Sequence, residues 1–226
     1  MDIQAATPRN NQIRRMRSLI AVKIVSELVL PSGDTICMRI LVVLLLACTA
    51  NAATLRYWIE PCTGPERVCH AADPELAQWA IEAWQGASGG VLTLEKAPSR
   101  ESAHIRINWT GGRETLYGEA RPILVDGVRG AEVYIVTPAQ RIPDELLRDA
   151  IVYLTCVHET GHALGLAHTA EFTDIMYSFH YGGDIKEYFG RYRRKLSVRA
   201  DIRKHSGMSQ EDVKRVVARF STSSPK

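Results

Sequence analysis

Three histidines and a glutamate stand close together between residues 158 and 168, and their types and spacing suit metal chemistry. His158 and His162 are four positions apart, so on an α-helix both imidazoles can point at one place. Zinc accepts neutral imidazole nitrogens at about 2.0–2.1 Å. Gly165 follows three residues later and can adopt the left-handed conformation that ends a helix sharply. The resulting turn would let His168 return to the same metal.

The pattern favours a catalytic zinc site over a structural one. Three protein ligands leave a fourth position for water. Glu159 lies about 100° round the helix from His158, beside the metal, where HExxH motifs carry a general base. We expect Glu159 to take a proton from the zinc-bound water as it attacks a carbonyl. A lone histidine is usually packed or solvated, but three of the seven histidines stand in this one register.

Composition indicates an ordinary globular protein. The chain has 226 residues, of which 46% are hydrophobic and 23% are charged, and this length suits one domain of roughly 150–200 residues plus a removable segment. The formal net charge of +3 is too small to argue for nucleic acid or membrane binding. We therefore expect no nucleic-acid partner.

The N-terminal region has the layout of an export signal. Residues 38–52 contain a basic residue, a short apolar run and small residues at Ala50 and Ala52, which predicts a signal peptide cleaved after Ala52. The run is too short to span a bilayer comfortably. Residues 1–37 are interpreted as an extension upstream of the true start, with an unusually long signal as the alternative. Lipoprotein anchoring at Cys48 is a further alternative.

The rest of the chain, residues 53–226, predicts an α+β domain. Strands are expected at 55–60, 91–94, 104–109 and 133–136, with turn signals at Asp126-Gly127 and Gly130. Helices are expected from Asp73, which would be the N-cap, from Pro143 to about residue 164, and over 209–220. Ser209 and Asp212 form a capping-box-like start to the last helix.

Cysteine positions are compatible with an oxidising compartment. Cys62 and Cys69 lie close together among turn residues and could close a small disulfide loop. Cys156 falls inside a predicted helix and is expected to be a buried thiol. The pairing of Cys62 with Cys69 remains open at this point.

With its extension to His168 and a following methionine, the motif resembles the signature of the metzincin zinc endopeptidases. Met176 matches their methionine turn, in which the methionine packs beneath the metal. Residues 162–169 are closest to the matrixins, and the resemblance covers most of 54–220. It implies a mostly parallel twisted sheet with one antiparallel edge strand, packed on a long zinc-binding helix and a C-terminal helix. It also implies an endopeptidase that cleaves peptide or protein substrates with one catalytic zinc. The predicted signal peptide indicates that the enzyme is secreted, in an extracellular or periplasmic location, and we expect a monomer.

Three features depart from the matrixin pattern. No cysteine-switch propeptide stands between the predicted signal and Leu55. Ser178 replaces the proline that usually follows the Met-Tyr pair, so the wall of the primed-side pocket would differ. Acidic, glycine-rich calcium loops are thin, with Asp126 and Glu132 the nearest candidates. Structural calcium is therefore left open.

Further residues have alternative interpretations. Tyr177 could stabilise an oxyanion or shape a specificity pocket, although a core tyrosine is the plainer interpretation. The resemblance suggests that Leu116, Tyr117 and Gly118 pair with an extended substrate. His180 and His205 lie in polar stretches and are expected to be solvated.

The basic stretch 191–204 is interpreted as a solvated loop. It could alternatively bind an acidic substrate or an anionic polymer. A non-catalytic secreted binding domain that uses this loop on a zinc-protease scaffold is thus the alternative function, although such a domain would not need Glu159.

Overall fold

The protein's structure, a computed structural model, describes residues 52–64, 68–111, 117–138 and 142–221. A five-stranded sheet in the order β2-β1-β3-β5-β4 forms its centre. The pairs β1–β2, β1–β3 and β3–β5 are parallel, and β4 pairs antiparallel with β5 at the edge. The strands are β1 (Ala53–Ile59), β2 (Leu92–Lys96), β3 (Ile105–Gly111), β4 (Gly118–Val125) and β5 (Val128–Thr137). The expected mostly parallel sheet with an antiparallel edge is confirmed.

The inner face of the sheet is apolar because side chains alternate along each strand. Ile105 and Ile107 of β3, with Val133 and Ile135 of β5, are fully buried. Residues between them face the other way and are polar. On that outer face, Glu132 of β5 forms an ion pair with β3, at 3.2 Å from Arg106.

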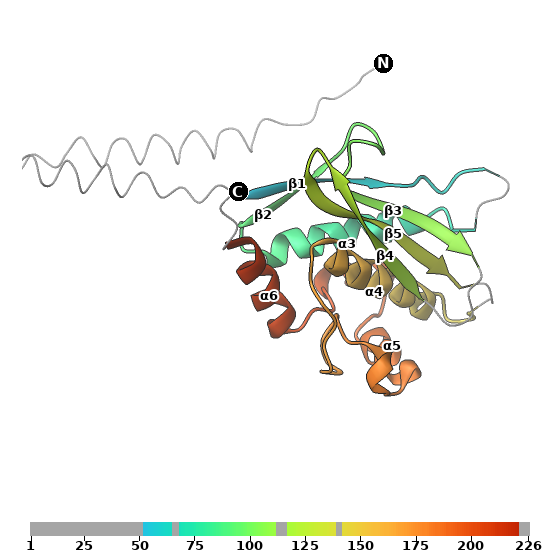
Figure 1. The fold of residues 1–226 in the computed structure, drawn as a ribbon. Helices are drawn as coiled ribbons and strands as arrows, with labels where there is room; N and C mark the ends of the chain where they lie inside the picture. The colour runs from blue at the N-terminus through green and yellow to red at the C-terminus, as the bar shows by residue number, and fades with distance from the viewer. Residues whose placement is uncertain (1–51, 65–67, 112–116, 139–141, 222–226) are drawn as a thin grey trace, which may run out of the picture. The chain divides into compact units, whose positions relative to one another are not determined.

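Helices α3 (Asp73–Ala87) and α4 (Glu145–Ala163) cover the inner face of the sheet (Figure 1). Trp84 of α3 is fully buried, and its indole N–H donates to the carbonyl of Val157 in α4 at 2.8 Å. This contact fixes the two helices against each other. The remaining elements are α5 (Ile185–Arg193), α6 (Gln210–Ser221) and the 3₁₀ helices η1 (Phe179–Tyr181) and η2 (Arg199–Lys204).

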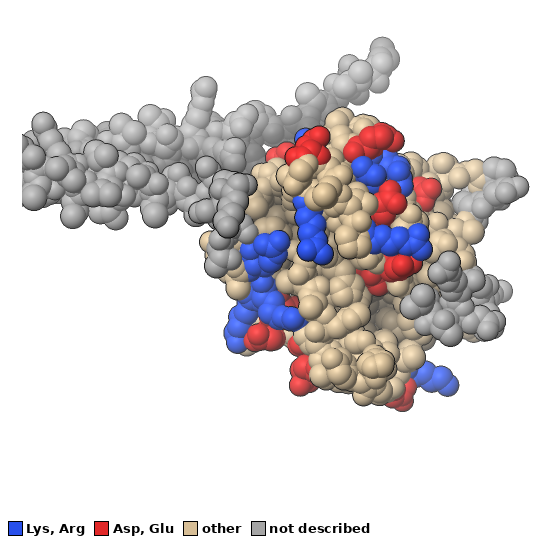
Figure 2. Space-filling model, in the orientation of Figure 1, with Lys and Arg blue, Asp and Glu red and all other residues tan. Residues whose placement is uncertain are grey.

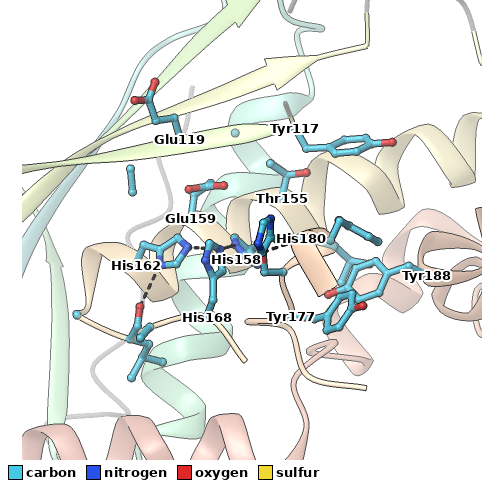
Figure 3. A pocket seen from close by; sticks show the side chains of 18 of the residues that line it. Tyr117, Glu119, Thr155, His158, Glu159, His162, His168, Tyr177, His180 and Tyr188 are labelled. Carbon is cyan, nitrogen blue, oxygen red and sulfur yellow. Dashed lines mark hydrogen bonds between the residues drawn. The ribbon is translucent and has the colours of Figure 1, made fainter. Parts of the chain in front are cut away.

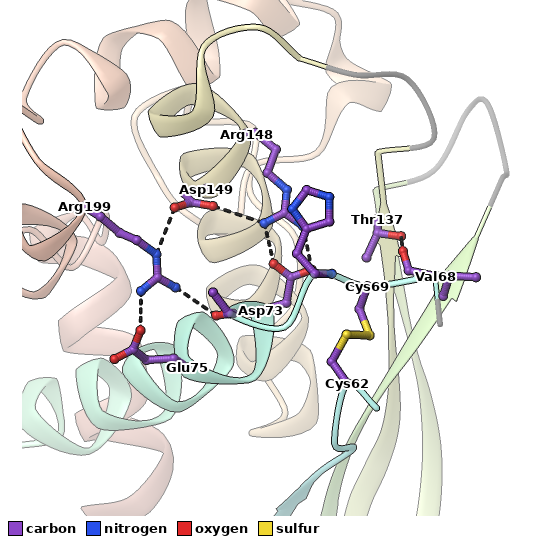
Figure 4. A network of polar contacts seen from close by, with 11 residues as sticks. Cys62, Val68, Cys69, Asp73, Glu75, Thr137, Arg148, Asp149 and Arg199 are labelled. Atoms are coloured by element: carbon purple, nitrogen blue, oxygen red, sulfur yellow. Dashed lines mark hydrogen bonds and ion pairs between the residues drawn. A yellow bond between two sulfur atoms is a disulfide. The ribbon is translucent and has the colours of Figure 1, made fainter. Parts of the chain in front are cut away.

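The predicted N-cap role of Asp73 is wrong, whereas the capping box of the last helix is confirmed. Asp73 is fully buried and pairs with Arg148 of α4 through two oxygen–nitrogen contacts, one of them 2.6 Å long (Figure 4). A buried guanidinium requires a carboxylate partner, which draws Asp73 away from its own helix end. At α6, Ser209 and Asp212 exchange backbone N–H to side-chain bonds of 2.8 and 3.0 Å.

Two turn predictions have different outcomes. Asp126 and Gly127 join β4 to β5 with φ of 51° and 77°, as a tight hairpin requires. Gly130 is not in a turn but inside β5. A Cβ at Gly130 would lie 1.9 Å from the carbonyl oxygen of His104, so glycine is needed there for close strand approach.

The interpretation of residues 191–204 as a solvated loop is also wrong. Their first residues end α5, and their last residues form η2. Leu196 and Ile202 are buried, and Tyr192 belongs to the same core. These apolar anchors hold the segment on the domain while its cationic side chains remain near the surface.

The structure decides the pairing that the sequence left open, and it confirms the expectation for Cys156. Cys62 and Cys69 form a disulfide, and Cys156 is a buried thiol in α4. No helix in the described part of the chain is long and apolar enough to cross a membrane.

Candidate metal centre

Helix α4 carries the first two histidines of the site and ends sharply after them. Its N-cap is Asp144, whose carboxylate accepts the N–H of Leu147. At the other end, Gly165 has φ of 90°, and its N–H donates to the carbonyl of His162 while Leu166 donates to that of Gly161. This pair of bonds is a Schellman motif, and it turns the chain back toward the helix.

The reversal brings His168 to the imidazoles of His158 and His162 (Figure 3). The Nε2 atom of His168 lies 3.2 Å from Nε2 of His158 and 3.0 Å from Nε2 of His162. The ligand atoms of all three side chains lie within 4.8 Å of one another. Three nitrogen donors therefore converge on one point, as the sequence predicted for this trio.

Backbone carbonyls set the tautomers of the two helical histidines. Nδ1 of His158 lies 2.6 Å from the carbonyl oxygen of Ile175, and Nδ1 of His162 lies 2.9 Å from that of Leu166. A carbonyl can only accept, so each Nδ1 carries the proton and each Nε2 presents a lone pair. Lone pairs that face one another repel unless a cation lies between them. This donor set fits a zinc ion, with its outer nitrogens oriented as ligand histidines usually are.

Burial favours the neutral form of these imidazoles, which is the form that binds a metal. Burial lowers the pKa of His158 to about 4. Burial also lowers the pKa of His162 and of His168. All three side chains are therefore neutral near pH 7, the protonation state that binds a metal.

Glu159 stands beside the triad in a buried position. Only 6% of the residue is exposed, and burial, with a smaller contribution from the negative charge of Glu119, raises the pKa of its carboxyl to about 8. A divalent cation nearby would act in the opposite direction. The side chain lies against β4, where a Cβ at Gly118 would come within 2.6 Å of Cγ of Glu159. Glycine at 118 thus makes room for the carboxylate.

The triad and Glu159 line a cleft of about 710 Å³ that runs beside β4. Among the described residues, β4 pairs with one strand, β5, and it therefore forms an edge of the sheet, where a further strand can pair. Gly118, Glu119 and Ala120 of this strand line the cleft. The arrangement can hold an extended chain next to a metal and a buried carboxylate.

The Matrixin family model matches residues 49–188 of the chain. The protein belongs to the matrixin family. Membership implies zinc metalloendopeptidase activity and peptide or protein substrates. No curated protein matches the chain.

In this matrixin, Met176 and Tyr177 are both buried. A Cβ at Gly161 would lie 2.3 Å from Sδ of Met176, so the methionine packs directly on the zinc-binding helix. The ring of Tyr177 lines the cleft, but its hydroxyl donates to the carbonyl of Gly182 at 2.8 Å. That bond favours the core interpretation of Tyr177 over an oxyanion role.

The other predicted residues of the matrixin site are only partly brought together. Gly118 and Tyr117 line the cleft, and the ring of Tyr117 packs at a tilt against that of Phe189, with the centroids 5.0 Å apart. Leu116 lies outside the described residues. His180 is exposed at the cleft, and His205 lies elsewhere, in a separate cavity.

The two calcium candidates are engaged in ion pairs. Asp126 pairs with Arg56 at 3.1 Å, and Glu132 pairs with Arg100 and Arg106 at 2.7 and 3.2 Å. Among the described residues, only the histidine triad forms a group of three side chains that could hold a metal.

Sequence reasoning missed the aromatic wall of the cleft. Phe179, Tyr188 and Phe189 line it together with Tyr177, and Tyr188 and Phe189 come from the unpredicted helix α5. The recurrence of Tyr188, Tyr192 and Leu196 at four-residue spacing is the signal that could have revealed this helix.

Proposed function

We propose that this matrixin is a secreted endopeptidase in which His158, His162 and His168 hold zinc and Glu159 is the general base. One observation carries the assignment. Three imidazole nitrogens converge on one point beside a buried carboxylate, next to the edge strand of the sheet. A structural zinc site needs neither the carboxylate nor the open strand edge.

Zinc, when bound, polarises the scissile carbonyl and lowers the pKa of a coordinated water. The chain's own residues do the rest. The edge strand β4 aligns an extended peptide through main-chain hydrogen bonds. The carboxylate of Glu159 accepts the proton of the attacking water and delivers it to the leaving amine. The carbonyls of Ile175 and Leu166 hold the imidazoles in their orientation throughout.

The mechanism is tested by Glu159→Ala, with Glu211→Ala as the matched control because Glu211 is exposed on α6. Loss of a general base lowers kcat by about 10²–10⁴-fold, so we expect cleavage of a peptide mixture to fall at least 100-fold while zinc content is unchanged. The control should cleave at the wild-type rate. Wild-type cleavage by Glu159→Ala would refute the role of this carboxylate.

We propose that export precedes this activity, with residues 38–52 as the signal peptide, 1–37 as an upstream extension and 53–226 as the catalytic domain. The disulfide between Cys62 and Cys69 supports an oxidising compartment. N-terminal sequencing of exported protein should read from Ala53. A lipidated start at Cys48 would favour the lipoprotein alternative, and an unprocessed cytosolic chain would contradict export.

A further inference from the structure

Most cationic side chains of the segment 191–204 form ion pairs with acidic side chains of the same domain. Four arginines pair with acidic side chains: Arg193 with Asp144 at 2.9 Å, Arg194 with Glu187 at 2.5 Å, Arg203 with Glu82 at 2.9 Å, and Arg199 with both Asp149 and Glu75. Figure 4 shows Arg199 between α3 and α4. These cations hold the segment in place and leave little charge for an extended anionic partner.

Two cations of the same segment have no such partner. In the described part of the chain, no carboxylate oxygen lies within 4.0 Å of the charged nitrogens of Arg191 or Lys195. The guanidinium of Arg191 lies over the rings of Phe172 and Tyr188, at 4.8 and 4.5 Å from their centroids. These cation–π contacts hold the guanidinium beside the two rings, and all of its N–H groups are donors that an anion can accept.

Arg191 and Lys195 both line a second cavity, of about 400 Å³, outside the catalytic cleft. Lys204 and His205 line it as well, whereas no aspartate or glutamate of the described residues does. Three acidic side chains are bonded to lining residues: Asp201, at 2.7 Å from Nζ of Lys204, Glu171, which accepts the hydroxyl of Thr173, and Asp212, which accepts the N–H of Ile175 at 2.8 Å. Of the three cationic side chains that line the cavity, Lys204 is paired, whereas Arg191 and Lys195 have no ion-pair partner among the described residues.

Residues 205–207, which line this cavity, are held in place by hydrogen bonds and close packing. The hydroxyl of Tyr192 donates to the carbonyl of His205 at 2.6 Å, and that of Tyr153 donates to the carbonyl of Ser206 at 3.1 Å. Gly207 has φ of 78°, and a Cβ there would lie 2.5 Å from Leu154. Ser206 accepts the N–H of Met208 through its hydroxyl oxygen, so its O–H remains able to donate into the cavity.

We propose that this second cavity binds a phosphate or sulfate group. A tetrahedral dianion offers acceptors in several directions, which matches the guanidinium of Arg191, the ammonium of Lys195 and the hydroxyl of Ser206. Leu154 and Tyr188 line both this cavity and the catalytic cleft, so the anion would sit directly behind the cleft wall. The proposal is independent of catalysis, because it concerns binding by residues outside the metal centre.

The test is calorimetric titration of the zinc-loaded protein with sodium sulfate and with inorganic phosphate, against sodium chloride at equal ionic strength. Lys195→Gln changes an exposed side chain and so preserves the fold, while Arg191→Gln removes the stacked cation. Arg194→Gln is the matched control, because Arg194 is exposed and already paired with Glu187. Loss of one charge-assisted bond weakens affinity about tenfold or more.

We expect saturable binding by the wild type and the control, and at least about tenfold weaker binding by both cavity variants. Absence of saturable binding, or equal affinity in all four proteins, would overturn the proposal; equal affinity would locate the anion elsewhere, for example at the metal. Phosphatidylcholine vesicles with and without phosphatidylglycerol identify the source of the group. Binding to the anionic vesicles that the cavity variants lose assigns a lipid headgroup, and binding of free phosphate alone assigns a soluble ligand.

Discussion

The orientation of the imidazoles of His158 and His162 depends on residues that the motif does not contain. Their spacing predicted that the imidazoles share one face of a helix, and the structure has them there. The carbonyls that fix their tautomers belong to Ile175 and Leu166. Those contacts depend on the path of the loop after α4, which side-chain spacing does not encode. The hydrogen bond from Tyr177 to Gly182 was unpredictable for the same reason.

His104 gives a pH-dependent prediction at the residue scale. Its Nδ1 accepts the backbone N–H of Arg56 at 2.8 Å, and burial, followed by the Arg56 guanidinium, lowers its pKa below the ordinary value of 6.5. Between pH 6.5 and the lower folded-state pKa, His104 is protonated in the unfolded chain but neutral in the folded protein. The stabilisation from His104 is therefore fully present above pH 6.5 and is lost as pH falls toward the folded-state pKa.

The comparison is between wild type and His104→Asn, whose amide oxygen can accept the same N–H without titrating. Urea unfolding at about pH 7.5 and about pH 5.5 gives the free energy of unfolding of each protein. We expect the wild type to lose more stability on acidification than the variant. The three ligand histidines titrate in both proteins, so their contribution cancels. Parallel losses would show that His104 does not carry the effect.

At the scale of elements, strong patterns were predictable and weak ones were not. Helix α4 has an apolar stripe, an N-cap at Asp144 and a glycine at its end, and its limits were predicted to within about two residues. β4 was missed because it is an exposed edge strand interrupted by Pro122, which only an edge tolerates. α5 was missed because its arginines obscure the spacing of its buried aromatic residues.

Replacing two helical glycines by alanine should change the free energy of unfolding in opposite directions. A Cβ at Gly161 of α4 would lie 2.3 Å from Sδ of Met176 and 3.0 Å from Trp84, so Gly161→Ala should destabilise by about 1–3 kcal/mol through overpacking. A Cβ at Gly86 of α3 would meet nothing within 4 Å. Gly86→Ala should therefore stabilise by about 0.5–1 kcal/mol.

Chemical denaturation of the two glycine variants measures both free-energy changes. The comparison is matched because each change adds one methyl group to an α-helix. A stable Gly161→Ala would mean that Met176 does not pack against the zinc-binding helix as the structure has it. Retained zinc in a destabilised Gly161→Ala would separate this packing from metal binding.

Across the whole molecule, sequence reasoning anticipated the α+β class, the sheet type and the histidine cluster, and it misjudged the use of charge. Acidic and basic side chains are interspersed on the face seen in Figure 2. The buried pair of Asp73 and Arg148 and the bridges of Arg199 join segments far apart in the chain. Charge runs in sequence do not reveal such partners, because pairing is decided by tertiary distance.

Paired charge also weakens the alternative of a non-catalytic binding domain. That alternative relied on the basic stretch 191–204 as an extended interaction surface. Four of its arginines are neutralised within the domain, so the positive charge that remains is confined to one small cavity. The buried carboxylate of Glu159 beside the triad has no use in a binding domain.

The central claim is that the three histidines hold the zinc on which peptide cleavage depends. The most direct measurement is zinc content together with cleavage of a peptide mixture, before and after chelation, for wild type, His168→Ala and His180→Ala. His180 is the matched control, because it lines the same cleft but stands outside the triad. We predict one zinc per chain and zinc-restorable cleavage in wild type and His180→Ala, with both lost in His168→Ala. Undiminished cleavage by the zinc-free protein, or full zinc content and activity in His168→Ala, would contradict the account.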